Sequence, residues 1–306
     1  MPASVSVRVP GTTSNLGAGF DCVGVAVGRW LRVTARAHGV AGTVAIERHG
    51  TLRALDSPPD ADLLYRGFVA ACRQAGRDVP AGLVLVADSD IPVARGLGSS
   101  AAATVAGAAA ATALLALALD RDALAALCAE LEGHADNVAP AVYGGATLVL
   151  PGPPPHGLIV TPLVIHESLV LVFAVPDFTV ETKRARAVLP ATVTHAQAVC
   201  AAAKGAALVH GLAHADPRLL AAGFDDVLHV PFRRALIPGY DDVTAAARAA
   251  GAFGATLSGS GPTLVAVTRP GKATTVGQAM VRAWRARGIA AESFHAARPA
   301  AGYEAD

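Results

Sequence analysis

The order of apolar and polar residues predicts a chain of mixed strands and helices. Residues 5–9 read Val-Ser-Val-Arg-Val, and a period of two is typical of a strand buried on one face. Residues 62–74 instead carry Leu, Phe and Cys near helical spacing, and Gly76 follows as a helix stop. By the same criteria, we expect strands at 25–37, 43–48, 83–87, 146–150, 158–165, 169–175, 256–258, 263–268 and 289–294, and helices at 99–119, 122–132, 194–212, 241–250 and 272–287.

The succession of these elements indicates an α+β fold. Strands and helices do not alternate regularly, which argues against a doubly wound parallel sheet. Residues 151–157, Pro-Gly-Pro-Pro-Pro-His-Gly, can continue neither a helix nor a central strand. Because a chain of 306 residues commonly divides into two cores, we expect an N-terminal part (1–155), a C-terminal part (156–306) and a cleft between them.

The composition argues against nucleic acid or membrane partners. With 25 Lys and Arg against 24 Asp and Glu, the formal charge of +1 gives no strong field for nonspecific binding to nucleic acid. Mean hydropathy is +0.44, but much of the apolar content is alanine. The uncharged run at 96–119 contains few strong hydrophobes, so we expect it not to span a membrane. The first residues lack the features of a secretory signal, and we expect a cytoplasmic protein.

The cysteines indicate neither a disulfide framework nor a structural metal. Cys22, Cys72, Cys128 and Cys200 lie far apart, and no Cys-x-x-Cys occurs. This spacing favours buried, reduced thiols.

The strongest chemical signal is a glycine-rich turn that runs into a helix. Residues 91–102 read Ile-Pro-Val-Ala-Arg-Gly-Leu-Gly-Ser-Ser-Ala-Ala. Unpaired amides at a helix start, together with the helix dipole, bind anions such as a polyphosphate. A Walker loop is excluded because no lysine follows Gly98, and a dinucleotide loop is disfavoured because residues 88–92 separate strand and turn. From the loop alone, an ordinary turn with serine caps remains the alternative.

Two further clusters combine glycines with hydrogen-bonding residues. Residues 9–22 follow the first strand and concentrate Asn, Asp and hydroxyl groups, which suits the binding of a small polar substrate. Residues 255–263 form another glycine turn between expected strands. By itself, this third cluster could be a hairpin.

In order, content and separation, the three clusters resemble those of the GHMP kinases. The stretch from Pro92 to Ala101 matches the phosphate loop of that family almost residue for residue. Within the family, residues 10–21, 132–140, 236–239 and 257–263 are most similar to the motifs of homoserine kinases. The resemblance implies an N-terminal mixed sheet with helices, a ferredoxin-like C-terminal part and an active site in the cleft. It also implies transfer of the ATP γ-phosphate to the hydroxyl of L-homoserine, as in threonine biosynthesis.

The resemblance further implies which residues hold ATP and Mg²⁺. One carboxylate after the phosphate loop should bind the metal together with Ser99. We expect Glu130, four residues before His134, and keep Glu132 as the alternative, since two residues apart on a helix cannot face the same site. The residues expected at ATP are Ile91, Pro92, Val93, Ala94, Arg95, Gly96, Leu97, Gly98, Ser99, Ser100 and Ala101.

Homoserine carries an ammonium, a carboxylate and a hydroxyl, so its site needs an acid, an arginine and neutral hydrogen-bonding groups. By resemblance, Asn15 and Asp21 contact the hydroxyl and amino ends and Asn137 lies near the transferred group; Asn15, Glu130 and Asn137 are the expected catalytic residues. The carboxylate should be bound by Thr182, Arg186 and Arg233.

We expect direct transfer without a protein base, with Asp136 structural. The alternatives are another small-molecule kinase of this family, of mevalonate or sugar type, and a non-catalytic nucleotide-binding regulator. By analogy with relatives, the chain could form a homodimer.

Overall fold

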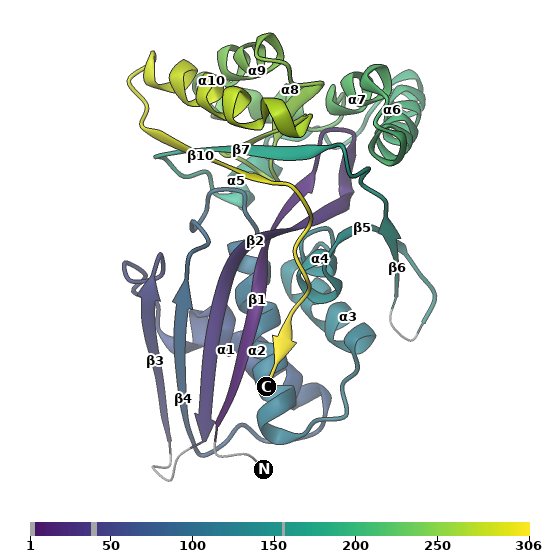
Figure 1. Cartoon of the computed structure of the whole chain (residues 1–306). Helices are drawn as coiled ribbons and strands as arrows, with labels where there is room; N and C mark the ends of the chain where they lie inside the picture. The colour runs from purple at the N-terminus through teal and green to yellow at the C-terminus, as the bar shows by residue number, and fades with distance from the viewer. Residues whose placement is uncertain (1–3, 38–41, 155–156) are drawn as a thin grey trace.

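The N-terminal part is built on a seven-stranded sheet, seen in the lower half of Figure 1. The computed structural model describes residues 4–37, 42–154 and 157–306. The strand order is β11-β1-β2-β4-β3, and β5 and β6 continue from β2. Its strands are β1 (Ser4–Asn15), β2 (Gly19–Ala37), β3 (Thr43–Gly50), β4 (Gly82–Ser89), β5 (Ala146–Pro151), β6 (Leu158–Leu163) and β11 (Glu304–Ala305). Neighbouring strands are antiparallel except β3 and β4, which are parallel.

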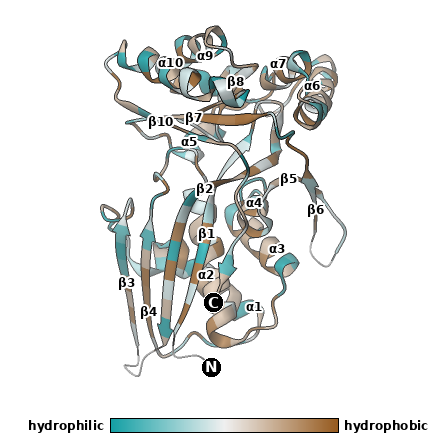
Figure 2. Ribbon diagram, viewed as in Figure 1, coloured by the Kyte–Doolittle hydropathy of each residue, from teal (hydrophilic) through white to brown (hydrophobic). Residues whose placement is uncertain are grey.

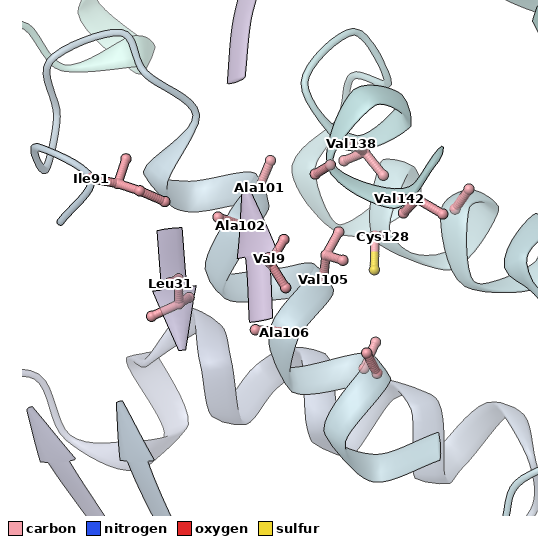
Figure 3. Packing of buried hydrophobic residues seen from close by; sticks show 14 of the residues in the cluster. Val9, Leu31, Ile91, Ala101, Ala102, Val105, Ala106, Cys128, Val138 and Val142 are labelled. Atoms are coloured by element: carbon pink, nitrogen blue, oxygen red, sulfur yellow. The ribbon is translucent and has the colours of Figure 1, made fainter. Parts of the chain in front are cut away.

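Four helices accompany this sheet, and one of them lies inside the core. They are α1 (Leu63–Gln74), α2 (Ser99–Leu115), α3 (Arg121–Glu132) and α4 (Val138–Tyr143). Helix α2 is buried along most of its length. Figure 3 shows Ala101, Ala102 and Val105 close to Val9 of β1. A helix enclosed in this way needs small side chains, which explains why an alanine-rich, uncharged run is not a membrane span.

The C-terminal part is a four-stranded antiparallel sheet covered by helices, at the top of Figure 1. Its strands are β7 (Val170–Pro176), β8 (Gly254–Leu257), β9 (Leu264–Thr268) and β10 (Ala291–Ala296), and its covering helices are α9 (Tyr240–Ala249) and α10 (Ala273–Arg285). The strand order β10-β7-β9-β8 and the chain order strand, helix, strand, strand, helix, strand are those of a ferredoxin-like unit. The predicted architecture of this part is confirmed.

Strand β7 is buried on both faces and packs with one hydrophobic cluster on each, so it connects the two parts. Phe173 and its neighbours two positions away on either side belong to the large core that also contains Val9. Val172 and the corresponding neighbours on the other face pack with α9 and α10. Figure 2 accordingly shows β7 as a continuous hydrophobic strand. A run of apolar residues without alternation is what a strand between two cores requires.

The connection from β7 to α9, within the C-terminal part, carries four further helices. Between β7 and α9 these are α5 (Thr182–Ala187), α6 (His195–His214), α7 (Pro217–Phe224) and α8 (Val230–Arg233). After β10 the chain returns to the N-terminal sheet, where β11 pairs with β1 (Figure 1). The expected boundary between residues 155 and 156 lies outside the described residues. Residues 158–163 on its far side still pair with β5 of the first sheet.

The structure contains most of the expected elements and adds several short ones. Helices α4, α5, α7 and α8 were not foreseen, and α2 ends at Leu115 because Ala116 adopts a left-handed conformation. All four cysteines are free; Cys72 and Cys128 are buried, whereas Cys200 is exposed, so the expectation of burial is wrong there. No helix in the described residues is long and apolar enough to cross a bilayer.

Helices α1 and α2 cross at glycines that allow their backbones to touch. A Cβ atom on Gly107 would lie 1.9 Å from the carbonyl oxygen of Leu64, and one on Gly67 would lie 2.2 Å from that of Thr104. Both distances are far inside van der Waals contact. The position of α2, and of the phosphate loop before it, therefore depends on these two glycines.

We predict that Gly107→Ala lowers the free energy of unfolding by about 1–3 kcal/mol, because the added methyl forces the two helices apart. Gly205→Ala in α6 is the matched control. Its Cβ would meet only the carbonyl oxygen of Ala18, at 3.4 Å, so higher helix propensity should raise stability by up to about 1 kcal/mol. Urea unfolding of both variants checks the prediction, and a neutral Gly107→Ala would contradict it.

Candidate active site

The three glycine-bearing clusters of the sequence meet at one place. The amide of Thr12 donates to the Leu97 carbonyl at 3.0 Å, and that of Thr263 donates to the Arg95 carbonyl at 3.2 Å. The amide of Gly259 donates to the Ser14 carbonyl at 3.0 Å, which joins the first and third clusters directly. Segments that are far apart in sequence therefore form one hydrogen-bonded unit around the phosphate loop.

Two glycines make this close approach possible. Gly96 and Gly98 have φ angles of 74° and 68°, in the left-handed region that favours glycine. A Cβ on Gly96 would lie 2.3 Å from the Ser258 carbonyl oxygen, and one on Gly98 would lie 1.9 Å from Thr12 Oγ1. Conformation and space thus both exclude a side chain at these positions.

The carbonyls of the loop are used inside the protein, which leaves its amides for a ligand. Besides the carbonyls of Arg95 and Leu97, that of Ala94 accepts from Val180 N, that of Gly98 from Ala102 N, and that of Gly96 from Ser258 Oγ at 2.5 Å. In the described part of the chain, the amides of residues 96–101 donate to no acceptor. Together with the dipole of α2, they form an anion site. The alternative of serine caps is wrong, because the N-cap residue is Gly98 and no side chain caps the helix.

A cavity of about 520 Å³ extends from this loop in two directions. Toward β3 and α1 its wall is largely apolar. That wall contains Leu31, Ile46, Leu52, Leu55, Leu63, Leu64, Ala87 and Val93. A nearly buried ion pair, Arg48–Asp62 at 2.7 Å, borders it, and Arg48 also donates to the Ser57 carbonyl. This end suits a flat apolar group such as a nucleotide base.

The opposite end of the cavity is charged. Asp21 and Arg186 form a bidentate pair at 2.9 and 3.0 Å, with each side chain a little over one third exposed. Arg233 is only 2% exposed yet also lines the cavity. Its pKa is lowered by burial and by the nearby charge of Arg186. The structure therefore places Asp21, Arg186 and Arg233, three of the predicted substrate residues, at one end of the same cavity.

A second ion pair lies beside the first. His134 Nδ1 is 2.9 Å from Asp136 Oδ1. Burial opposes both charges, but the hydrogen bond and the mutual attraction outweigh it, so the pKa of His134 is raised and that of Asp136 is lowered. Asn137 donates through Nδ2 to Ser14 Oγ at 2.9 Å and accepts through Oδ1 from Thr12 Oγ1 at 2.8 Å. All of these residues except Thr12 line the cavity.

The remaining predicted substrate residues also reach the cavity. Thr182, the first residue of α5, lies with its Oγ1 3.4 Å from Ser260 Oγ. The amide of Asn15 is used within the protein, since Nδ2 donates to the Gly259 carbonyl and Oδ1 accepts from Asp21 N, both at 2.9 Å. The Asn15 side chain thus holds the first and third clusters together while it lines the site.

Not every residue of the predicted phosphate loop faces the cavity. Ile91 and Leu97 are 1% exposed and belong to the core. Arg95 turns away, toward the Pro176 carbonyl and Asp177 at the end of β7. The loop residues that line the cavity are Val93, Ala94, Gly96, Gly98, Ser99, Ser100 and Ala101.

Of the two candidate carboxylates, Glu132 lies at the loop and Glu130 does not. Glu132 accepts from Ser100 Oγ at 2.7 and 2.9 Å and from Thr104 Oγ1 at 2.8 Å, and it lines the main cavity. Glu130 lines a separate surface pocket beside Leu158. The structure thus corrects the placement expected for Glu130. The hydroxyls of α2 fix the orientation of Glu132, and the spacing to His134 carries no such information.

Comparison with known proteins identifies the family. The pattern of the GHMP kinases N terminal domain matches residues 62–145, and that of the GHMP kinases C terminal domain matches residues 208–286. The chain is 41% identical to a homoserine kinase of Picosynechococcus sp. over 292 residues, which cover 94% of each chain. The chain belongs to the GHMP kinase family. The family inferred from the three clusters is thereby confirmed.

Solved structures of this family have the same fold. The crystal structure of homoserine kinase from Cytophaga hutchinsonii matches with a TM-score of 0.88 at 32% identity, over 100% of this chain and 98% of that one. Streptococcus pneumoniae phosphomevalonate kinase in complex with phosphomevalonate and AMPPNP matches with a TM-score of 0.72, but at 13% identity it shares the fold alone. The family domains and the homoserine kinase relatives make this chain a kinase that uses ATP and acts on a hydroxyl group.

Sequence reasoning missed the apolar wall of the cavity. Its residues come from β2, β3, the stretch between β3 and α1, the start of α1, β4 and the phosphate loop, and no spacing connects them. One local signal was available. Asp62 caps α1 by accepting from Leu64 N, and an N-cap aspartate after a Ser-Pro-Pro stretch predicts a fixed entry into that helix.

The His134–Asp136 pair predicts a pH-dependent contribution to stability. The raised pKa of His134 means that its contribution is present below the ordinary value of 6.5 and is lost as the pH rises through the folded-state pKa. The lowered pKa of Asp136 means that its contribution is present above 3.8 and is lost as the pH falls through its own folded-state pKa. Near pH 5 both contributions to the free energy of unfolding are present.

We therefore predict that His134→Gln lowers the free energy of unfolding by about 1.5–3 kcal/mol at pH 5, the range for a hydrogen bond between charged groups, and by less at pH 9. Urea unfolding at the two pH values measures the difference. His49→Gln on exposed strand β3 is the control and should cost little at either pH. An equal cost of His134→Gln at both values would count against an ionised pair.

Proposed function

We propose that this chain transfers the γ-phosphate of ATP to the side-chain hydroxyl of L-homoserine and forms O-phospho-L-homoserine. The observation that carries the proposal is the layout of one cavity. Free amides at the start of α2 lie at its middle, an apolar wall lies at one end, and a cluster of one carboxylate and two guanidinium groups lies at the other. Homoserine kinases among the relatives support the same reaction.

The charged end complements a zwitterion. Asp21 offers a carboxylate to an ammonium group, and Arg186 and Arg233 offer guanidinium groups to a carboxylate. The neighbouring His134–Asp136 pair adds no net charge. Mevalonate and sugars carry no ammonium group that could take the place of Arg186 on Asp21. Thr182 completes the site at the carboxylate end.

ATP fits the remainder of the cavity. The amides of residues 96–101 bind its phosphates, and the apolar wall between β3 and α1 receives the base. Because Arg95 is held by Asp177 and the Pro176 carbonyl, the loop offers amides rather than a basic side chain. Much of the phosphate charge therefore has to be neutralised by a metal ion.

The residues beside the loop fit Mg²⁺. This ion prefers oxygen ligands and usually takes one or two carboxylates together with the phosphates, and Glu132, Ser99 and Ser100 present oxygens to the cavity. We assign the metal to Glu132 and Ser99. Mg²⁺ supplies charge neutralisation at the transferred phosphate.

The protein's own contribution is positioning. Asp21, Arg186 and Arg233 hold the two charged groups of homoserine, which directs its hydroxyl toward the mouth of α2. Asn137 is fixed by Thr12 and Ser14 at the cavity wall, where the hydroxyl arrives. The carboxylate of Asp136 is held by His134 and is 2% exposed, so we assign it no role as a base. The homoserine hydroxyl attacks the γ-phosphorus directly, the bond from that phosphorus to the bridging oxygen breaks and ADP leaves, and the proton of the hydroxyl passes to the transferred phosphate.

Three further expectations complete this proposal. The chain divides into an N-terminal and a C-terminal kinase domain, with the boundary expected near residue 155 although β6 still pairs within the first sheet; it acts in the cytoplasm; and, by analogy with relatives, it could form a homodimer.

Activity with a panel of acceptors tests the proposed reaction. We predict ADP release with Mg-ATP and L-homoserine, and no release above the background without acceptor for mevalonate, galactose or shikimate. Phosphorus NMR should show O-phosphohomoserine as the product. Turnover of mevalonate or galactose at the rate of homoserine would contradict the proposal.

The two glutamates provide a matched test of the metal site. Glu132→Gln keeps an acceptor for Ser100 and Thr104 but removes the negative charge, so we predict a loss of kcat of about 10- to 100-fold and a higher Mg²⁺ requirement. Glu130→Gln should leave kcat and the Mg²⁺ requirement within about twofold of the values for the unsubstituted protein, since a surface substitution rarely has a larger effect. The opposite ranking would return the role to Glu130.

A further inference from the structure

A buried histidine next to Arg233 has no place in the function described so far. His229 lies between α7 and α8, is fully buried and does not line the cavity. Its Nε2 lies 3.1 Å from the Gly17 carbonyl oxygen, in the turn between β1 and β2, and its Nδ1 lies 3.3 Å from Arg233 Nη1. One imidazole ring thus connects the turn before Asp21 with the buried arginine.

The two contacts require the same form of the ring. A carbonyl oxygen only accepts, so Nε2 must carry the proton. Arginine only donates, so Nδ1 must be free of a proton. Both conditions describe the neutral Nε2–H tautomer. Burial, reinforced by the charge of Arg233 and opposed by Asp226, lowers the pKa of His229 to about 4, which keeps the ring neutral at physiological pH.

The backbone and ring contacts of His229 fix its position. Asp226 Oδ2 accepts from the amides of Leu228, His229 and Val230, at 3.0, 2.6 and 2.8 Å, and so holds the start of α8. The ring of Phe20 stacks on the imidazole at 4.7 Å with an 18° angle between the planes. The guanidinium carbon of Arg233 lies 5.1 Å from the centre of the same Phe20 ring.

Arg233 is therefore held on two of its three nitrogens. Nε donates to the Ala185 carbonyl at 3.0 Å, and Nη1 donates to His229 Nδ1 at 3.3 Å and to the Gly259 carbonyl at 3.5 Å. Nη2 has no hydrogen-bond partner among the residues that the structure describes. Without His229, Nη1 would lose the shorter of its two contacts and keep only the 3.5 Å one to the Gly259 carbonyl, so the plane of a side chain with many rotatable bonds would be less firmly fixed.

We propose that His229 is a positioning residue for substrate binding: through its Nδ1 acceptor it orients Arg233 toward the substrate carboxylate, and through Nε2–H it ties that arginine to the turn that carries Asp21. The inference rests on the proposed function, because it assumes that the ligand of Arg233 is a carboxylate. This arrangement would also contribute to specificity. One imidazole ring keeps Arg233 at a constant distance from the turn that carries Asp21, and these two residues bind the two ends of a zwitterion.

Three substitutions separate the two functions of the ring. His229→Leu removes both contacts. His229→Asn retains an acceptor near the position of Nδ1, and His229→Gln retains a donor near the position of Nε2. We expect His229→Leu to raise the KM for homoserine about 10- to 100-fold, the equivalent of one hydrogen bond to a charged group, with the KM for ATP within about twofold.

The pattern of rescue decides between positioning and mere packing. His229→Asn should recover most of the homoserine KM, and His229→Gln should recover much less. His210→Leu on the exposed face of α6 is the control and should change neither KM. Thermal melting verifies that each variant is folded. If His229→Leu does not fold, the difference between His229→Asn and His229→Gln carries the test.

Equal rises in both KM values, or identical homoserine KM values for His229→Asn and His229→Gln, would overturn the inference. An unchanged homoserine KM in His229→Leu would overturn it as well. These results are distinct from failure of the proposed function, in which the unsubstituted chain would not phosphorylate homoserine at all.

Discussion

The site depends on one constraint, which is that every carbonyl of residues 94–98 accepts a hydrogen bond from the protein. The donors come from three different regions, β1, the segment around residues 258–263 and the chain before α5, together with α2 itself. Because the carbonyls are turned inward, the amides of the same peptide units are free to face a ligand. The glycines follow from this arrangement, since the donors approach so closely that a Cβ at Gly96 or Gly98 has no space.

This constraint needs the two parts of the chain to be held firmly together. Donors from both parts reach the same loop, so relative motion of the parts would break these bonds. The shared core around β7 provides the rigidity. Phe173 packs in one cluster with residues of β1 and α2, while the opposite face of its strand supports α9 and α10. A phosphate site with few charged side chains therefore rests on an extensive apolar core.

The sequence was sufficient to predict the parts of the site that are encoded locally. A glycine turn before a helix start has the same physical meaning in any chain, and the resemblance of three such clusters to one family indicated that they meet. The fold class followed from the order of the elements. Helices such as α5 and α8 were missed because each spans fewer than two turns and is held by tertiary contacts rather than by its own periodicity.

Side-chain direction could not be predicted in the same way. Glu130 and Glu132 differ by two positions, and only the hydroxyls of Ser100 and Thr104, which lie about 30 residues earlier in the sequence, select the second. The apolar wall of the cavity is also formed by tertiary contacts between segments far apart in the sequence, and its residues share no regular spacing. Asn15 was expected to contact substrate; in the structure its Nδ2 donates to the Gly259 carbonyl of the third cluster, and its Oδ1 accepts from Asp21 N within the first. Where function depends on tertiary contacts, a sequence motif predicts which residues lie near the site but not what each side chain does there.

The two arginines of the charged end show why burial matters for the substrate site. Arg186 and Asp21 are each more than one third exposed, and an exposed pair contributes only about 0–1 kcal/mol. A zwitterion can therefore replace that pair at small cost, its ammonium on one partner and its carboxylate on the other. Arg233 is 2% exposed, and moving a charge that has been taken out of water is expensive. It must be in place before the ligand arrives, which is what the carbonyl of Ala185 and the imidazole of His229 achieve.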